Sequence, residues 1–91
     1  MTMQIKLIDG KFTHAEADEL ITKIIRTKIV FLEKKTLRIH PSAADIQYAH
    51  SRIEQLQQYL QKMKSELALK NEPFITIHAS IEINLPPSLH Q

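Results

Sequence analysis

Three side-chain types that occur in hydrolytic triads, His78, Ser80 and Glu82, alternate with apolar residues in the segment 74–85. Residues two apart on a strand lie roughly 6.5 Å apart along its axis. A nucleophile and its base need about 2.6–3.2 Å between heavy atoms. The spacing therefore argues against a triad and predicts a solvated polar strand face. With Thr76, these side chains are candidates for a surface that contacts a ligand or a partner.

The histidines, at positions 14, 40, 50, 78 and 90, raise the possibility of a metal site. They form no H-x-H, H-x-x-x-H or H-E-x-x-H spacing, so only ligands that converge from distant positions could bind a metal. The chain has no cysteine, which excludes thiolate catalysis and cysteine-containing zinc sites. Gly10 is the only glycine, which excludes glycine-rich phosphate loops. We therefore predict no cofactor, no metal and no enzymatic activity.

Basic residues concentrate between positions 22 and 40, where Glu33 is the only acid, although the net charge is +2. Such a segment can contact nucleic acid. The residues that would do so are Lys23, Arg26, Lys34, Lys35, Arg38 and Arg52. The simpler interpretation is that bases near the end of a helix complement its dipole, with Glu16, Asp18 and Glu19 at its start. Because no aromatic platforms accompany the bases, we rank nucleic-acid binding second.

The first part of the chain predicts a strand over residues 2–8, followed by a helix. Thr13 and Glu16 have the spacing of a capping box. An apolar stripe follows at helical spacing: Ala17, Leu20, Ile21, Ile24, Phe31 and Leu32. No Gly or Pro interrupts residues 15–39, so the helix is predicted to end before His40 and Pro41.

Three residues in this helix are candidates for an interaction surface. Lys28 lies within the apolar stripe, where its aliphatic stem can cover apolar surface or its charge can recognise a partner. Val30 and Leu37 are seven residues apart and would form a second stripe on the other side of the helix. The sequence therefore predicts that something outside the helical hairpin covers Val30 and Leu37.

A second helix is predicted from Ser42, a capping residue, to the region before Pro73. Its apolar residues alternate at spacings of three and four, as in a coiled-coil seam. They are Ile46, Ala49, Ile53, Leu56, Leu60, Met63 and Leu67.

Together these elements predict an α+β fold in the order β-α-α-β, with a long antiparallel helical hairpin and two antiparallel strands. The alternative makes residues 27–40 a β-hairpin, which gives the ferredoxin-like order βαββαβ. Residues 1–85 are expected to form one domain and residues 86–91 a flexible tail. No apolar segment is long enough to cross a bilayer, so a cytoplasmic location is expected.

The predicted strand over residues 2–8 is shorter than the predicted strand over residues 74–85. Part of the longer strand would therefore lack a partner within the chain, and an exposed apolar edge invites pairing with another chain. We predict a homodimer formed through the C-terminal strand, the first helix, or both. The function expected is that of a small non-enzymatic interaction or scaffolding module.

Overall fold

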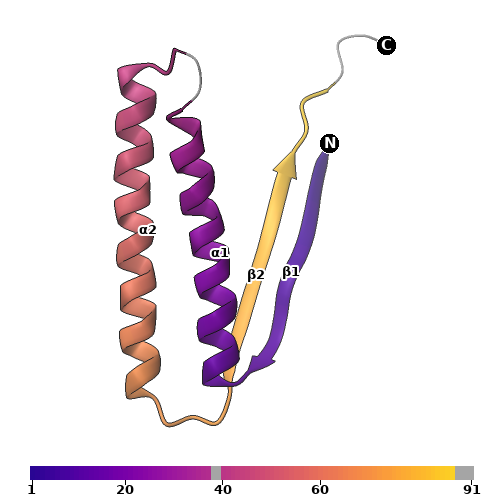
Figure 1. The fold of residues 1–91 in the computed structure, drawn as a ribbon. Helices are drawn as coiled ribbons and strands as arrows, with labels where there is room; N and C mark the ends of the chain where they lie inside the picture. The colour runs from indigo at the N-terminus through magenta and orange to yellow at the C-terminus, as the bar shows by residue number, and fades with distance from the viewer. Residues whose placement is uncertain (38–39, 88–91) are drawn as a thin grey trace.

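The chain folds in the order strand, helix, helix, strand (Figure 1). The computed structural model describes residues 1–37 and 40–87. Its elements are β1 (Thr2–Phe12), α1 (His14–Lys35), α2 (Ala43–Leu69) and β2 (Ile75–Asn84). The predicted α+β fold of β-α-α-β order is confirmed. The ferredoxin-like alternative is wrong, because α1 is helical through Lys35 where a hairpin would have turned.

Helix α1 begins at the predicted capping box. The Glu16 amide donates to Thr13 Oγ1 at 3.1 Å, and the Thr13 amide donates to Glu16 Oε1 at 2.9 Å. The helix ends at Lys35, earlier than predicted. Thr36 Oγ1 donates to the Glu33 carbonyl at 2.7 Å, which satisfies a carbonyl of the last turn with a local side chain. Leu37 therefore lies in a turn, and Arg38 is outside the described residues.

The helices pack along the predicted seam of α2. Leu32, Ala49 and Leu56 form a buried cluster, with Ile25, Ile29 and Ile53 packed against it. The predicted stripe on α1 is partly wrong, because Ile24 and Phe31 are exposed. Residues 21, 25, 29 and 32 form one row at helical spacing, and residues 17, 20, 24 and 31 form the adjacent row. Residues 25, 29 and 32 of the first row pack in the cluster with α2, whereas Ile24 and Phe31 of the second row stay exposed.

Strand β1 is longer than predicted and pairs antiparallel with β2, so that every residue of β2 has a partner in β1. A bulge at Leu7 shifts the pairing register within β1. Lys6 pairs with Ser80, and Ile8 pairs with the next residue, Ala79. The prediction that part of the C-terminal strand lacks an intrachain partner is therefore wrong.

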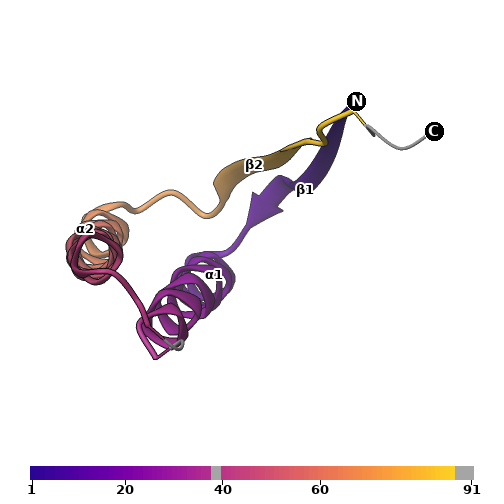
Figure 2. The same cartoon turned by 90° about the horizontal axis from the view of Figure 1, so that it is seen from above.

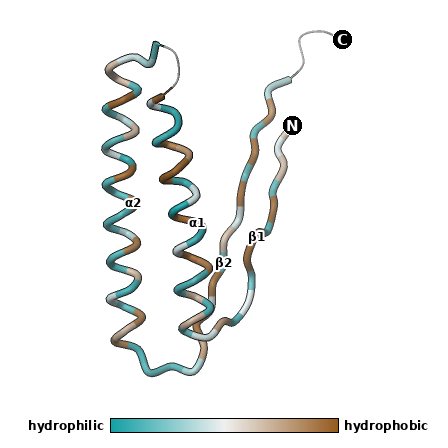
Figure 3. Tube along the Cα trace, in the orientation of Figure 1, coloured by the Kyte–Doolittle hydropathy of each residue, from teal (hydrophilic) through white to brown (hydrophobic). Residues whose placement is uncertain are grey.

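The bulge also changes which side chains point inward. An extra residue shifts the alternation by one, so Ile8, rather than Leu7, shares the apolar face with Ala79. Ile8 is 8% exposed and Leu7 is 50% exposed. After the bulge, Gly10 and Phe12 continue on this apolar face, and Figure 3 shows apolar positions along both strands.

The sheet and the helix pair lie close together near the β1–α1 junction and diverge toward the other end (Figures 1 and 2). Among the described residues, α1 touches both strands and α2 touches neither. The Cα radius of gyration is 17.0 Å, whereas about 12 Å is expected for a compact domain of this length. The chain is therefore flat and open, with extents of 52 × 35 × 14 Å.

Candidate interaction surfaces

The polar face of the sheet carries the four strand residues singled out from the sequence, Thr76, His78, Ser80 and Glu82, and all four are exposed. Opposite side chains on this face bond to one another. Thr2 Oγ1 donates to Asn84 Oδ1 at 3.2 Å, and Gln4 Nε2 donates to Glu82 Oε1 at 3.4 Å. Such cross-strand pairs are typical of a solvated sheet surface.

One pair on this face, Asp9 and His78, brings a carboxylate next to an imidazole. Asp9 Oδ1 and His78 Nδ1 are 2.6 Å apart, the arrangement by which a carboxylate orients an imidazole. Ser80, the potential nucleophile, lies opposite Lys6 instead. The side chains of His78 and Asp9 are 70% and 44% exposed, so water competes for the pair. The pair joins β1 to β2, because Asp9 and His78 are partners in the sheet.

The six bases proposed for nucleic-acid contact do not gather into one surface. Lys23, Arg26 and Val30 line a shallow hollow on the outer side of α1, and Lys34 follows four residues later. Lys23 also pairs with Glu19 at 2.9 Å. Lys35 lies over the Phe31 ring on another side of α1.

The other two bases of that set do not extend the outer side of α1. Arg52 belongs to α2, where its Nη1 donates to Gln55 Oε1. Arg38 lies outside the described residues. Lys23, Arg26 and Lys34 therefore form a short cationic strip on α1, and Val30 lies among them.

The two apolar residues proposed to share a helical stripe are separated by the end of α1. Val30 is 46% exposed on the cationic side of the helix. Leu37 is 82% exposed, but it lies in the turn after Lys35. The predicted continuous stripe of Val30 and Leu37 is therefore not formed, because the helix ends between them.

Lys28 lies beside an exposed aromatic ring. Its Nζ is 5.2 Å from the centroid of Phe31, and Lys35 Nζ approaches the same ring at 5.8 Å. Both distances allow a cation–π attraction. Phe31 nevertheless stays 49% exposed, so the two lysines border the ring without covering it.

The main feature that the sequence did not predict is an exposed apolar surface where the sheet and α1 diverge, away from the β1–α1 junction. On the sheet, the apolar face continues past buried Ile8 into two exposed cross-strand pairs, Met3–Ile83 and Ile5–Ile81. On α1, the row that begins with buried Ala17 continues into exposed Ile24 and Phe31. We call these six exposed residues the open apolar surface: Met3, Ile5, Ile24, Phe31, Ile81 and Ile83.

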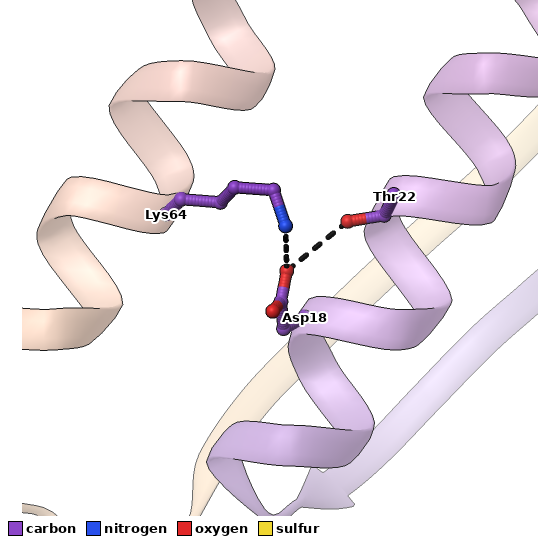
Figure 4. Close-up of polar contacts among 3 residues, drawn as sticks. All are labelled: Asp18, Thr22 and Lys64. Atoms are coloured by element: carbon purple, nitrogen blue, oxygen red, sulfur yellow. Dashed lines mark hydrogen bonds and ion pairs between the residues drawn. The ribbon is translucent and has the colours of Figure 1, made fainter.

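An ion pair fixes the helices at the end where the sheet is close. Asp18 Oδ1 of α1 accepts from Lys64 Nζ of α2 at 2.6 Å and from Thr22 Oγ1 at 3.1 Å (Figure 4). The bond from Lys64, assisted by that from Thr22, lowers the pKa of the Asp18 carboxyl. At the same end, His14 Nε2 lies 2.6 Å from the Glu72 carbonyl oxygen, which ties α1 to the α2–β2 connection.

A cavity of about 350 Å³ lies at the opposite end of the helix pair. Leu32 and Ala49 supply apolar lining, and Lys35 and Asp45 supply opposite charges. His40 and Tyr48 also contribute to the lining, and His40 has a left-handed φ of 56° before Pro41. The cavity adjoins the connection between the helices, which includes residues 38–39 outside the described part of the chain.

Within residues 1–37 and 40–87, no three His, Asp or Glu side chains are grouped closely enough to bind a metal ion. Neither helix in this part of the chain is both long and apolar enough to span a membrane.

Comparison with protein-family models, curated proteins and solved structures gives no match to this chain. The functional conclusion therefore depends on the chain's own surfaces.

Proposed function

We propose that this protein is a non-enzymatic interaction or scaffolding module that works as a homodimer in the cytoplasm. The observation that carries the proposal is the surface of a single chain. It exposes 7616 Å², whereas a compact monomer of 10.5 kDa is expected to expose about 5,400 Å².

The difference, roughly 2,200 Å², is large compared with a protein interface. A standard interface buries about 800 Å² on each partner. Even half of the excess would supply such an interface. Self-association through such an interface would bring the exposed surface of each chain closer to that expected of a folded protein of its size.

The small interior of the single chain supports the same proposal. Within residues 1–37 and 40–87, the buried hydrophobic residues are Ile8, Ala17, Leu32, Ala49 and Leu56, two of which are alanines. A two-stranded sheet is marginally stable in water unless more strands or a helix cover it. Here α1 covers only the part of the sheet near the β1–α1 junction (Figure 2). A second subunit would complete the core.

The non-enzymatic part of the proposal is supported by the positions of the groups capable of chemistry. His78 pairs with Asp9 on an open sheet face, while Ser80 lies opposite Lys6. We therefore assign His78, Thr76, Ser80 and Glu82 to a polar surface that a dimer would display twice, where a further partner can bind.

Light scattering on the full chain at micromolar concentration tests the proposal directly. We expect a molar mass twice that of the chain. A stable monomer across the accessible concentration range would contradict the proposed function.

A further inference from the structure

The open apolar surface has two parts, one on the sheet and one on α1, two elements that diverge from the β1–α1 junction (Figure 1). Met3, Ile5, Ile81 and Ile83 continue the face on which Ile8 is buried. Ile24 and Phe31 continue the helical row that begins with buried Ala17. Each part thus extends a face that is already buried near the β1–α1 junction.

We propose that a second copy of this chain binds the open apolar surface through a two-fold axis and uses its own open apolar surface to do so. The inference rests on the proposed homodimer and goes further by specifying its interface. It differs from an interface on the Val30 side of α1 and from one made by pairing of strand edges.

The area needed supports a second copy as the occupant. The excess surface of roughly 2,200 Å² exceeds the contribution of about 800 Å² that each subunit makes to a standard interface. In a two-fold interface the same patch contacts its counterpart, so each patch must be self-complementary. Apolar side chains of the sheet and of α1 meet this requirement, whereas the cationic strip of Lys23, Arg26 and Lys34 would repel its own copy.

The charged residues next to the open apolar surface would also allow a second copy to bury that surface. Lys28 and Lys35 border the Phe31 ring on long aliphatic stems. Such stems can cover the rim of an interface while their ammonium groups stay in water. The six residues of the open apolar surface are themselves uncharged, so binding a second copy buries no unpaired charge among them.

Two adjacent positions of α1 provide a matched test. Phe31 and Val30 are similarly exposed, at 49% and 46%, but belong to different sides of the helix. A glutamate at position 31 can pair with Lys28 or Lys35, and one at position 30 can pair with Arg26 or Lys34, all at helical spacing. The helix should therefore tolerate both Phe31→Glu and Val30→Glu.

We expect Phe31→Glu to weaken dimerisation at least thirtyfold, roughly the effect of losing one interface hot spot. Val30→Glu should leave the dimer unchanged. On the sheet, Ile81→Lys should act like Phe31→Glu, whereas Leu7→Lys, at the exposed bulge, should act like Val30→Glu. Sedimentation equilibrium gives the dissociation constants, and circular dichroism shows whether each variant is folded.

A footprinting measurement tests the surface without adding a charge to it. Because the chain has no cysteine, a single introduced cysteine gives an unambiguous reactivity signal. In the variant Ile24→Cys, alkylation should slow as the protein concentration rises through the dissociation constant. In the variant Val30→Cys, the rate should not depend on concentration.

The possible results separate the inference from the proposed function. A dimer that survives Phe31→Glu, or one that Val30→Glu dissociates, would refute this interface and leave the homodimer intact. Equal protection of the introduced thiol in Ile24→Cys and Val30→Cys would refute it as well. A wild-type monomer with the radius of gyration of about 12 Å that a compact domain has would refute both, because the chain would then cover its own apolar surface.

Discussion

Asp18 of α1 and Lys64 of α2 form an ion pair of 2.6 Å that joins the first turns of one helix to the last turns of the other (Figure 4). Both side chains are half-exposed, at 45% and 44%. Asp18 also accepts from Thr22, which holds the carboxylate toward α2. The pair therefore links the helices at a position where their contact is polar.

Replacing Asp18 with Asn should destabilise the protein at neutral pH and have little effect in acid. The pKa of Asp18 is lowered from its ordinary value of 3.8, chiefly by the bond from Lys64, so folding favours the ionised carboxylate. This contribution is complete above the unfolded pKa and is lost as the pH falls through the lower, folded pKa. Urea unfolding at several pH values below and above 3.8 measures the difference between wild type and Asp18→Asn.

Glu19→Gln is the matched control for this prediction. The pKa of Glu19 is also lowered, by the bond from Lys23, but both partners belong to α1 and are more exposed. Its loss should affect the free energy of unfolding less than the loss of Asp18 does. A destabilisation by Asp18→Asn that is as large in acid as at neutral pH would rule out the electrostatic explanation.

Leu56 tests the packing of α2 against α1. It is 8% exposed in the cluster with Leu32 and Ala49, and truncating such a leucine typically costs about 2–5 kcal/mol. Leu56→Ala should therefore lower the free energy of unfolding by an amount in this range. Gln57→Ala and Gln58→Ala, on the exposed flank, should change it by about 0.5 kcal/mol or less. Similar losses for all three variants in denaturation at one protein concentration would contradict the helical phase.

Because of the bulge in β1, the adjacent residues Leu7 and Ile8 differ in how far their side chains are buried. Ile8→Ala should cost about 2–5 kcal/mol because Ile8 is buried on the apolar face. Leu7→Ala should cost less than about 1 kcal/mol because the Leu7 side chain is half-exposed at the bulge. Thermal unfolding of the two variants distinguishes this register from a regular strand, in which Leu7 would point inward. A larger loss for Leu7→Ala would show that the bulge is misplaced.

The strongest local signals in the sequence predicted much of the fold. The capping box of Thr13 and Glu16 and the three-four spacing around Leu56 depend on neighbours along one helix, and both are confirmed. The end of β1 was missed because Leu7 and Ile8 are consecutive apolar residues that break the alternation. Gly10 also resembled a turn signal, although it continues the strand. Only pairing with β2 reveals the bulge.

Candidate surfaces were harder to predict, because α1 carries two adjacent apolar rows. Sequence spacing shows that Ile24, Ile25, Phe31 and Leu32 are apolar, but it does not show which row meets α2. Packing decides this: Leu32 is buried and Phe31 is left open. The cross-strand pairing of Ile5 with Ile81 also depends on contacts between distant parts of the chain. The open apolar surface could not be predicted without the positions of these elements.

Nucleic acid should bind only weakly to this protein. Lys23, Arg26 and Lys34 form a short strip, and Lys23 is already paired with Glu19. A few phosphate contacts give salt-sensitive, non-specific binding, typically with Kd of about 10⁻⁴–10⁻⁶ M, because they act by releasing counterions. Fluorescence anisotropy with labelled RNA and DNA at several salt concentrations measures this, with Arg26→Gln as the variant expected to reduce whatever binding occurs. Tighter binding is more than the strip alone can supply. A Kd below about 10⁻⁶ M at physiological salt would therefore contradict this prediction and favour a nucleic-acid function.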